Sequence, residues 1–277
     1  MSSLSRNLAL VVFATFVVVA IARADEPAKR VLRIAADPNN LPFTNDKGEG
    51  FENKIADLIA KDLNADIQYE WSAQRRGFFR DMLRHGDCDL TLSMPTEAER
   101  AAPSKPYYRS TFVFVSRRDR KLDLKSLDDP RLKKLKIGIQ LVIGGSTPPG
   151  QALASRGITE NIVGYTVAGD YREQSPTRNI IDAVVKGDVD VALVWGPMAG
   201  YFAKKSETPL TVTPLDTQKD GDIPLAFDIS IGIKRSNKAL KPEIDAVLLK
   251  RKDDINRILD EYGVPRVEKP HETSAAK

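Results

Sequence analysis

Polar and aromatic side chains follow the ends of several predicted strands, where a binding site for a small molecule would lie. Carboxylates, amides and hydroxyls hydrogen-bond to ligands, and aromatic rings cover apolar faces. A glycine turn that opens a helix presents backbone N–H groups to an anion. The set consists of Asp37, Asn39, Asn40, Phe43, Trp71, Gln74, Arg75, Ser93, Met94, Arg100, Gly145, Ser146, Thr147, Trp195 and Asp228. Because strand ends meet at one edge of a sheet, the sequence predicts that these residues share one cleft.

Each of these residues also has a structural interpretation that the sequence leaves open. Asp37 precedes Pro38, and an aspartate there favours a turn. Gly145 can serve backbone geometry alone, and Trp195 can pack between two parts of the chain. Their common placement after predicted strands favours the binding interpretation.

Groups for catalysis and metal binding are scarce. The chain has two histidines, His85 and His271, and one cysteine, Cys88. No His or Cys cluster has metal-ligand spacing, and no GKS or GKT loop is present. We therefore expect no enzyme activity, no metal and no cofactor in this chain. Carboxylate catalysis by Asp37 with Arg75 or Asp228 remains the weakest alternative.

Strand and helix patterns alternate along the first half of the chain. The first predicted helix carries Ile55 and Ile59 on one face, as a helix lying on a sheet does. The patterns predict strands over residues 31–35, 67–71 and 88–93 and helices over residues 53–63 and 77–85. This order indicates an α/β fold.

A second α/β series follows and indicates a second lobe. It comprises predicted strands over residues 136–139, 162–167 and 189–194 and helices over residues 149–156 and 177–186. The β-rich run 111–115 and the polar stretch 117–134 between the two series predict a crossing between lobes. A strand over 226–233 and a helix over 242–262 then return to the first lobe.

These patterns divide the chain into two lobes flanked by a signal and a tail. The predicted parts are a signal peptide over 1–24, a first lobe over 25–115 and 225–263, a second lobe over 116–224, and a disordered tail over 264–277. The tail is assigned because its last ten residues lack apolar periodicity.

The N-terminus has the three parts of a secretory signal. Arg6 precedes the apolar run 8–20, and Ala22 and Ala24 form an A-x-A cleavage site before Asp25. The run is shorter than the roughly 20 apolar residues that span a bilayer. We expect a periplasmic protein with no stable membrane anchor. Removal of residues 1–24 lowers the net charge from +4 to +2, which predicts no nucleic-acid partner.

Three segments resemble type II periplasmic binding proteins of the family that includes the polar amino-acid binders. They are ADPNNLPF (36–43), GFENKIADLIAKDL (50–63) and KPYYRSTFVFV (105–115). The resemblance covers the whole mature chain. It implies the α/β, two-lobe periplasmic binding protein type II fold with a hinge and an inter-lobe cleft.

The chain departs from the amino-acid binders at both charged positions of their site. Those proteins hold the α-carboxylate with an arginine in a Thr-x-x-Arg motif, whereas here Arg100 stands one residue late after Thr96. Their ammonium-binding aspartate is replaced by Trp195 in GDVDVALVWGP. An amino acid buried in the cleft would leave charges unpaired, so we expect another ligand or partner.

Four strings resemble one subgroup closely: the accessory proteins of quinoprotein methanol dehydrogenases, of the MoxJ and XoxJ type. They are ADPNNLPF, GEGFENKIADLIA, PYYRSTFVFV and VALVWGPMAGYFA. The resemblance implies an accessory that activates or matures a PQQ-dependent methanol or alcohol dehydrogenase through its cleft. The alternative is the binding component of an ABC importer for a small polar or anionic solute. The resemblance also keeps the carboxylate enzyme in view, because a few proteins of this fold are dehydratases.

Overall fold

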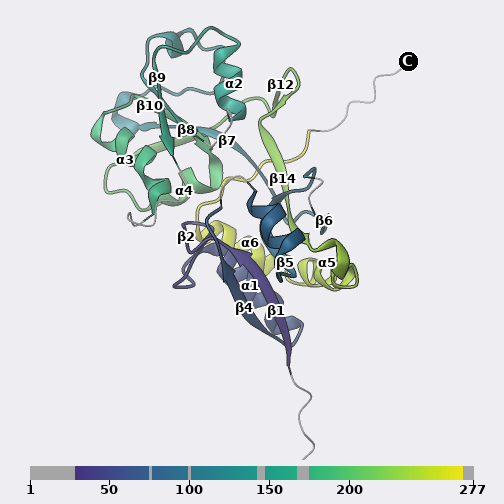
Figure 1. Ribbon diagram of the computed structural model, residues 1–277. Coiled ribbons are helices and arrows are strands. Elements are labelled where there is room, and N and C mark those ends of the chain that lie inside the picture. Colours follow the sequence, from purple (N-terminus) through teal and green to yellow (C-terminus); the bar gives the residue numbers. More distant parts are fainter. Residues whose placement is uncertain (1–28, 75–76, 99–100, 142–146, 167–174, 271–277) are drawn as a thin grey trace, which may run out of the picture.

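The computed structural model describes residues 29–270 except 75–76, 99–100, 142–146 and 167–174. Two lobes are joined by long strands (Figure 1). The predicted signal peptide lies outside the described residues. In the part that is described, no helix has the length and apolar character needed to cross a membrane.

The first lobe is a sheet with helices packed against it. Leu32 and Ile34 of its first strand are buried, as are Ile55 and Ile59 of the helix predicted to cover the sheet. Its strands are β1 (Arg30–Ala36), β4 (Ala65–Trp71), β5 (Leu90–Pro95), β14 (Ala226–Ile233) and the short β2 (Asn39–Asn40), β3 (Thr44–Asn45) and β6 (Ala102–Pro103). Its helices are α1 (Phe51–Asp62), α5 (Leu240–Lys250), α6 (Lys252–Glu261), the π-helical η1 (Arg80–His85) and the 3-10 turn η5 (Arg235–Asn237).

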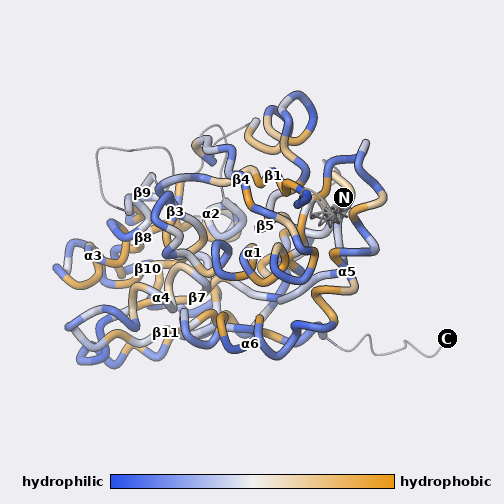
Figure 2. Tube along the Cα trace, turned by 90° about the horizontal axis from the view of Figure 1, so that it is seen from below, coloured by the Kyte–Doolittle hydropathy of each residue, from blue (hydrophilic) through white to orange (hydrophobic). Residues whose placement is uncertain are grey.

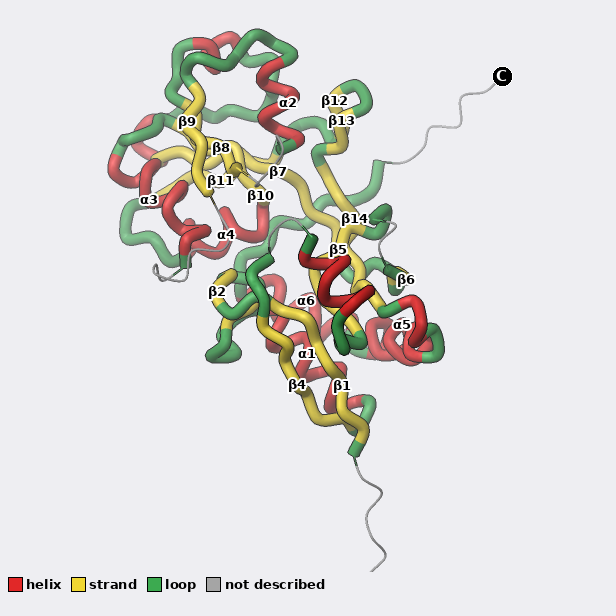
Figure 3. Tube along the Cα trace, in the orientation of Figure 1, coloured by secondary structure: helices red, strands yellow, loops and turns green. Residues whose placement is uncertain are grey.

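The second lobe repeats the α/β pattern (Figure 3). Its strands are β8 (Ile137–Leu141), β9 (Ile162–Thr166), β10 (Val191–Trp195), β11 (Leu210–Pro214) and the hairpin β12 (Lys219–Asp220) with β13 (Ile223–Pro224). Its helices are α2 (Pro148–Ala154), α3 (Asn179–Lys186) and α4 (Gly196–Lys204), with 3-10 turns η2 (Arg118–Arg120), η3 (Pro130–Lys133) and η4 (Pro176–Arg178). In Figure 2, β10 is mostly hydrophobic, in keeping with its buried place in the core.

One strand, β7 (Tyr108–Arg117), crosses from lobe to lobe. Its first residues pair with β14 of the first lobe, and Val113 to Arg117 pair with β10 or β11 of the second. The predicted crossing therefore lies in β7 over 111–115, whereas its second part over 117–134 is wrong. Leu124, Leu127 and Leu132 from that stretch are buried in the core of the second lobe, because their apolar side chains recur among the polar ones.

Two predicted helices differ from those observed. The helix over 242–262 is divided at Arg251 into α5 and α6, where Arg251 donates to both carboxylate oxygens of Asp62 on α1. The helix over 77–85 begins at Phe78 and becomes π-helical from Arg80. Apolar periodicity runs through both places and gives no sign of either change.

The segment 263–268 lies along β7, and we call it the C-terminal strap. Ser110 Oγ donates to Pro265 O at 2.6 Å, and the amide of Val267 donates to Arg109 O at 3.2 Å. A Cβ at Gly200 of α4 would overlap Gly263 O, so glycine lets the strap approach the helix. The prediction of disorder from residue 264 is therefore wrong for the strap; residues 271–277 lie outside the described part.

Candidate functional site

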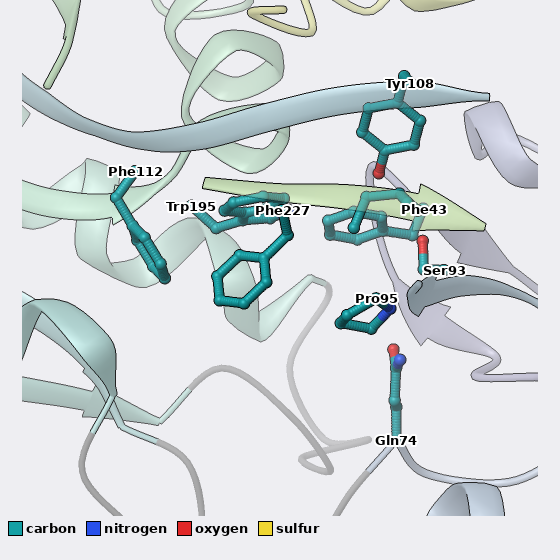
Figure 4. Close-up of a pocket in the computed structure, with 9 residues that line it drawn as sticks. Phe43, Gln74, Ser93, Pro95, Tyr108, Phe112, Trp195 and Phe227 are labelled. Carbon is teal, nitrogen blue, oxygen red and sulfur yellow. The ribbon is translucent and has the colours of Figure 1, made fainter. Parts of the chain in front are cut away.

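A cavity of about 240 Å³ lies where the two lobes meet. Aromatic rings form most of its wall, and they come from both lobes and from the crossing strand (Figure 4). The lining residues are Phe43, Gln74, Ser93, Pro95, Tyr108, Phe112, Trp195, Phe227 and Ile229. No carboxylate or cationic side chain is among these described lining residues.

The start of α1 positions Phe43 in the first-lobe wall. The amides of Phe51 and Glu52 donate to Pro42 O and Phe43 O at 2.8 and 3.0 Å. A Cβ at Gly50 would overlap Phe43 O, so the glycine allows this close approach. The Phe43 ring packs against Phe51 with centroids 5.4 Å apart. The GEGFEN sequence thus fixes an aromatic side of the cavity.

Three hydroxyl groups gather at the first-lobe end of the cavity. Ser93 Oγ and the phenol oxygens of Tyr107 and Tyr108 are buried, and none has a hydrogen-bond partner of good geometry among the described residues. Burial raises the pKa of both phenols well above its usual value, and the nearby Ser93 hydroxyl opposes the rise. Ser93 and Tyr108 line the cavity, so a ligand can reach their unused hydrogen-bonding capacity.

A buried carboxyl group lies behind this wall. Glu52 is 5% exposed, and its Oε1 has no hydrogen-bond partner among the described residues. Burial raises the pKa of Glu52 to about 8. The carboxyl group is therefore mostly protonated at neutral pH, and it adds no full negative charge beside Tyr107 and Tyr108.

Trp195 ends β10 and forms the second-lobe wall. Its amide donates to Gln140 Oε1 at 2.7 Å, which fixes the backbone at the strand end. Its ring meets Phe112 and Phe227 edge to face, with centroids 5.3 and 5.9 Å apart. Such edge-to-face pairs favour one arrangement of the three rings, so this wall is preformed.

The lobes also contact one another through residues outside the lining of this cavity. The amide of Ser175 donates to Asn39 Oδ1 at 3.1 Å, and Thr177 Oγ1 donates to Leu41 O at 2.6 Å. Tyr201 of α4 stacks on Tyr262, which follows α6, at 5.4 Å between centroids. These contacts hold the lobes together around the cavity.

Several residues of the predicted site gather at this cavity. Phe43, Gln74, Ser93 and Trp195 line it. Asn40 Nδ2 donates to Gln74 Oε1 at 2.6 Å and so supports the wall from behind. These four residues lie at or near strand ends and share one cavity, and their roles in binding stay predictions.

Asp37 organises the loop rather than the cavity. Its carboxylate accepts hydrogen bonds from the amides of Asn39 and Gln74 at 2.8 and 2.6 Å. Burial raises the pKa of Asp37, and these two hydrogen bonds oppose the rise. The turn interpretation therefore describes its hydrogen bonding, its side chain is outside the cavity lining, and its role in the cleft stays a prediction.

Four other predicted residues lie away from the cavity lining. Trp71 stacks on Tyr69 at 4.5 Å, and Met94 is fully buried in a core cluster. Thr147 Oγ1 donates to Gln140 O at 3.2 Å. Asp228 pairs with Arg109 at 3.2 Å. These four side chains lie outside the lining of this cavity, and their roles in the cleft stay predictions. For Trp71, Met94 and Asp228, which lie on strands, the alternation of side chains between the two faces of a strand decides which residues meet the cavity.

Arg75, Arg100, Gly145 and Ser146 lie outside the described residues. The proposed roles of the two arginines and of the glycine turn therefore stay predictions. Among the described residues, no group of three or more His, Cys, Asp or Glu side chains has the arrangement of a metal site.

Sequence reasoning missed five lining residues: Pro95, Tyr108, Phe112, Phe227 and Ile229. Tyr108 and Phe112 are four residues apart on β7, so they face the same side of the strand. Phe227 and Ile229 are two residues apart on β14, so they also face one side of their strand. This period-two spacing is a usable signal once the faces of β7 and β14 that meet the cavity are known.

Two α/β lobes that share a crossing strand and enclose a cavity define a two-lobe binding protein. Residues 32–265 match the family described as bacterial extracellular solute-binding proteins, family 3. The chain belongs to this family.

Three similar proteins refine this placement. Protein MoxJ of Methylorubrum extorquens is 35% identical over 257 residues, which are 88% of this chain and 84% of that protein. The crystal structure of periplasmic binding protein XoxJ from Methylobacterium extorquens AM1 is 37% identical, with a TM-score of 0.70 over 86% of this chain and 100% of the other. MxaJ from Methlophaga aminisulfidivorans MPT is 25% identical, with a TM-score of 0.74 over 85% and 100%. The predicted type II binding-protein fold and the resemblance to MoxJ and XoxJ are confirmed.

Proposed function

We propose that this chain is a periplasmic accessory protein of a PQQ-dependent methanol or alcohol dehydrogenase, which it activates or matures through its inter-lobe cleft. The similarity to MoxJ and XoxJ over most of the chain supports this assignment. The subgroup that the sequence resembles is associated with quinoprotein methanol dehydrogenases. The secretory signal over residues 1–24 would place the protein in the periplasm with such a partner.

The aromatic lining of the cavity is the observation that carries the proposal. Trp195 stands where the resemblance places the ammonium-binding aspartate of amino-acid receptors, and it meets Phe112 and Phe227. A buried zwitterion needs a partner for each charge, and an unpaired ion in such a site costs several kcal/mol. The chain has thus kept the two-lobe fold while losing a feature of amino-acid capture.

The contacts between lobes suit a role that depends on closure. Ser175 and Thr177 bond to Asn39 and Leu41 across the cleft through one hydrogen bond each. These hydrogen bonds can be exchanged when the lobes move, and a partner that binds the rim would favour one position. Contact with the dehydrogenase would then change the shape of this protein and of the surface presented to the enzyme.

Binding to the dehydrogenase tests this proposal directly. The mature protein, beginning at Asp25, is immobilised and exposed to periplasmic extract and separately to a purified quinoprotein methanol dehydrogenase. We expect the dehydrogenase to be retained and its active yield to rise when the two are produced together. Trp195→Ala should weaken retention at least tenfold, whereas Leu249→Ala, on an exposed part of α5, should not. Absence of both retention and any change in yield would contradict the proposal.

A further inference from the structure

The size and walls of the cavity restrict what it can hold. Its volume of about 240 Å³ is below the roughly 300–1,000 Å³ of pockets for drug-sized ligands. Five aromatic side chains line it: Phe43, Tyr108, Phe112, Trp195 and Phe227. A flat apolar molecule about the size of one ring fills such a space better than a branched polar one, because rings pack against rings over their whole area.

The unpartnered hydroxyls add one specific requirement. Tyr108 is 6% exposed, its hydroxyl lacks a partner among the described residues, and it points toward Ser93 and Phe43 (Figure 4). Ser93 Oγ is buried and also lacks a partner there. A buried hydroxyl without a hydrogen bond is unfavourable, so a ligand that bonds to it gains affinity. A hydroxyl or carbonyl group on the ligand meets this requirement.

The charges around the cavity decide the third property. The described lining offers no ionised side chain. Of the two predicted acids, Asp37 already accepts two backbone hydrogen bonds, and Asp228 is paired with Arg109. A charged ligand would lose its bound water and find no free opposite charge among these described residues, which is unfavourable. A neutral ligand does not need such a partner.

We propose that the inter-lobe cavity binds a small uncharged molecule with a flat apolar body and one hydroxyl or carbonyl group, which bonds to Tyr108 and Ser93. This inference rests on the proposed function only in taking the cavity as the binding site of the protein. It assigns a ligand class different from the amino acids of the wider family. The apolar body lies between the Phe43 side and the cluster of Trp195, Phe112 and Phe227.

Three probes of nearly equal size test the charge of the ligand: benzyl alcohol, benzoate and benzylamine. The chain contains two tryptophans, and Trp71 lies outside the cavity. Trp71→Phe therefore leaves Trp195 as a fluorescence reporter in the cavity wall. We expect saturable binding of benzyl alcohol at one site, at least tenfold tighter than binding of either charged probe. Tighter binding of benzoate or benzylamine, or no saturation by benzyl alcohol, would overturn the proposal.

Hydroxyl variants test the orientation of the ligand in the same Trp71→Phe background. Tyr108→Phe and Ser93→Ala each remove one hydroxyl and keep the ring or the backbone. We expect each to weaken benzyl alcohol binding by about three- to tenfold, the effect of one neutral hydrogen bond. Tyr165→Phe on β9 is the matched control and should leave binding unchanged. Unchanged binding in both hydroxyl variants would rule out the assigned hydrogen bond and overturn the proposal.

The two tests fail separately. The ligand proposal fails if the isolated protein binds no probe, or if it prefers a charged probe to benzyl alcohol. The proposed function fails if the protein does not retain the dehydrogenase, and that experiment uses no small-molecule probe. A protein that binds benzyl alcohol and retains no dehydrogenase would keep the ligand class and remove the partner.

Discussion

Individual polar residues in this protein take their properties from burial more than from their sequence neighbours. Glu52 is the clearest case, because it occupies the first turn of α1 and has an unpartnered oxygen beside Tyr107 and Tyr108. A favourable helix start would ordinarily keep a glutamate ionised. Here the loss of water outweighs that effect and raises the pKa of Glu52 to about 8.

Glu52 should make the stability of the protein fall as pH rises. Its folded pKa of about 8 lies above the usual 4.5, so the folded state favours the protonated form. The contribution of protonated Glu52 to the free energy of unfolding is therefore fully present below about pH 4.5 and is lost as pH rises through 8. Glu52→Gln should remove the decline and raise the free energy of unfolding at pH 8.5 by about 2–5 kcal/mol.

Urea unfolding at pH 5.5 and 8.5 measures this effect. Glu160→Gln, at an exposed position, is the control and should preserve the pH dependence of the wild type. An unchanged pH dependence in Glu52→Gln would show that the carboxyl group is hydrated in the folded protein.

At the residue scale, sequence patterns indicate where strands end but not the direction of each side chain. Phe43, Ser93 and Trp195 lie at or near strand ends and line the cavity. Met94 is the neighbour of Ser93 but faces the core, because adjacent strand residues point to opposite sides. The exact start of a strand decides which neighbour faces the cavity, and sequence patterns do not fix that start.

At the scale of elements, a change of direction between α5 and α6 depends on a contact distant in sequence. Arg251 lies at the junction and bonds through two nitrogens to Asp62 at the end of α1. The guanidinium holds the pKa of Asp62 down to about 2, with a smaller contribution from Lys250. Sequence periodicity predicted one helix because the apolar positions continue through the junction.

Asp62→Asn should loosen the junction of α5 and α6 from α1. The variant loses the ionic hydrogen bonds to Arg251, and we expect the free energy of unfolding at pH 7 to fall by about 1–3 kcal/mol. The lowered pKa makes this stabilisation fully present above about pH 4, with loss as pH falls toward 2.

Thermal unfolding at pH 7 and pH 2.5 tests this expectation. Asp253→Asn, an exposed change on α6, is the matched control. The difference between the wild type and Asp62→Asn should be largest at pH 7 and smaller at pH 2.5, where Asp62 begins to take up a proton. A difference of equal size at both pH values would show that packing, rather than the ion pair, holds the junction.

At the scale of the whole molecule, the two lobes are joined by more than the crossing strand. The C-terminal strap bonds to Ser110 and Arg109 of β7, and Gln218 Nε2 donates to Glu268 O at 2.7 Å. Val264 of the strap is buried. The two-lobe architecture was predictable from alternating strands and helices, but the strap was not, because its contacts follow from polar backbone groups without apolar periodicity.

Removal of the strap should destabilise the junction of the lobes. Deletion of residues 263–277 should lower the free energy of unfolding by about 2–4 kcal/mol, through loss of buried Val264 and of the hydrogen bonds to Ser110, Arg109 and Gln218. Small-angle scattering should also show a larger radius of gyration as the lobes separate.

Deletion of residues 271–277 is the control and should change neither quantity. Gly200→Ala provides a milder variant, because the added methyl group would displace the strap from α4 while the chain stays complete. Equal stability of the two deletion proteins would contradict a role for the strap.

The position of β14 has a consequence for the order in which the chain folds during synthesis. β14 lies between β5 and β7 in the sheet, yet it begins at Ala226. The sheet of the first lobe therefore has open edges on β5 and β7 until most of the chain has been made, whereas the strands that β7 pairs with in the second lobe come earlier. Unpaired edges recruit other strands, so the nascent first lobe is the part that most needs protection by a chaperone.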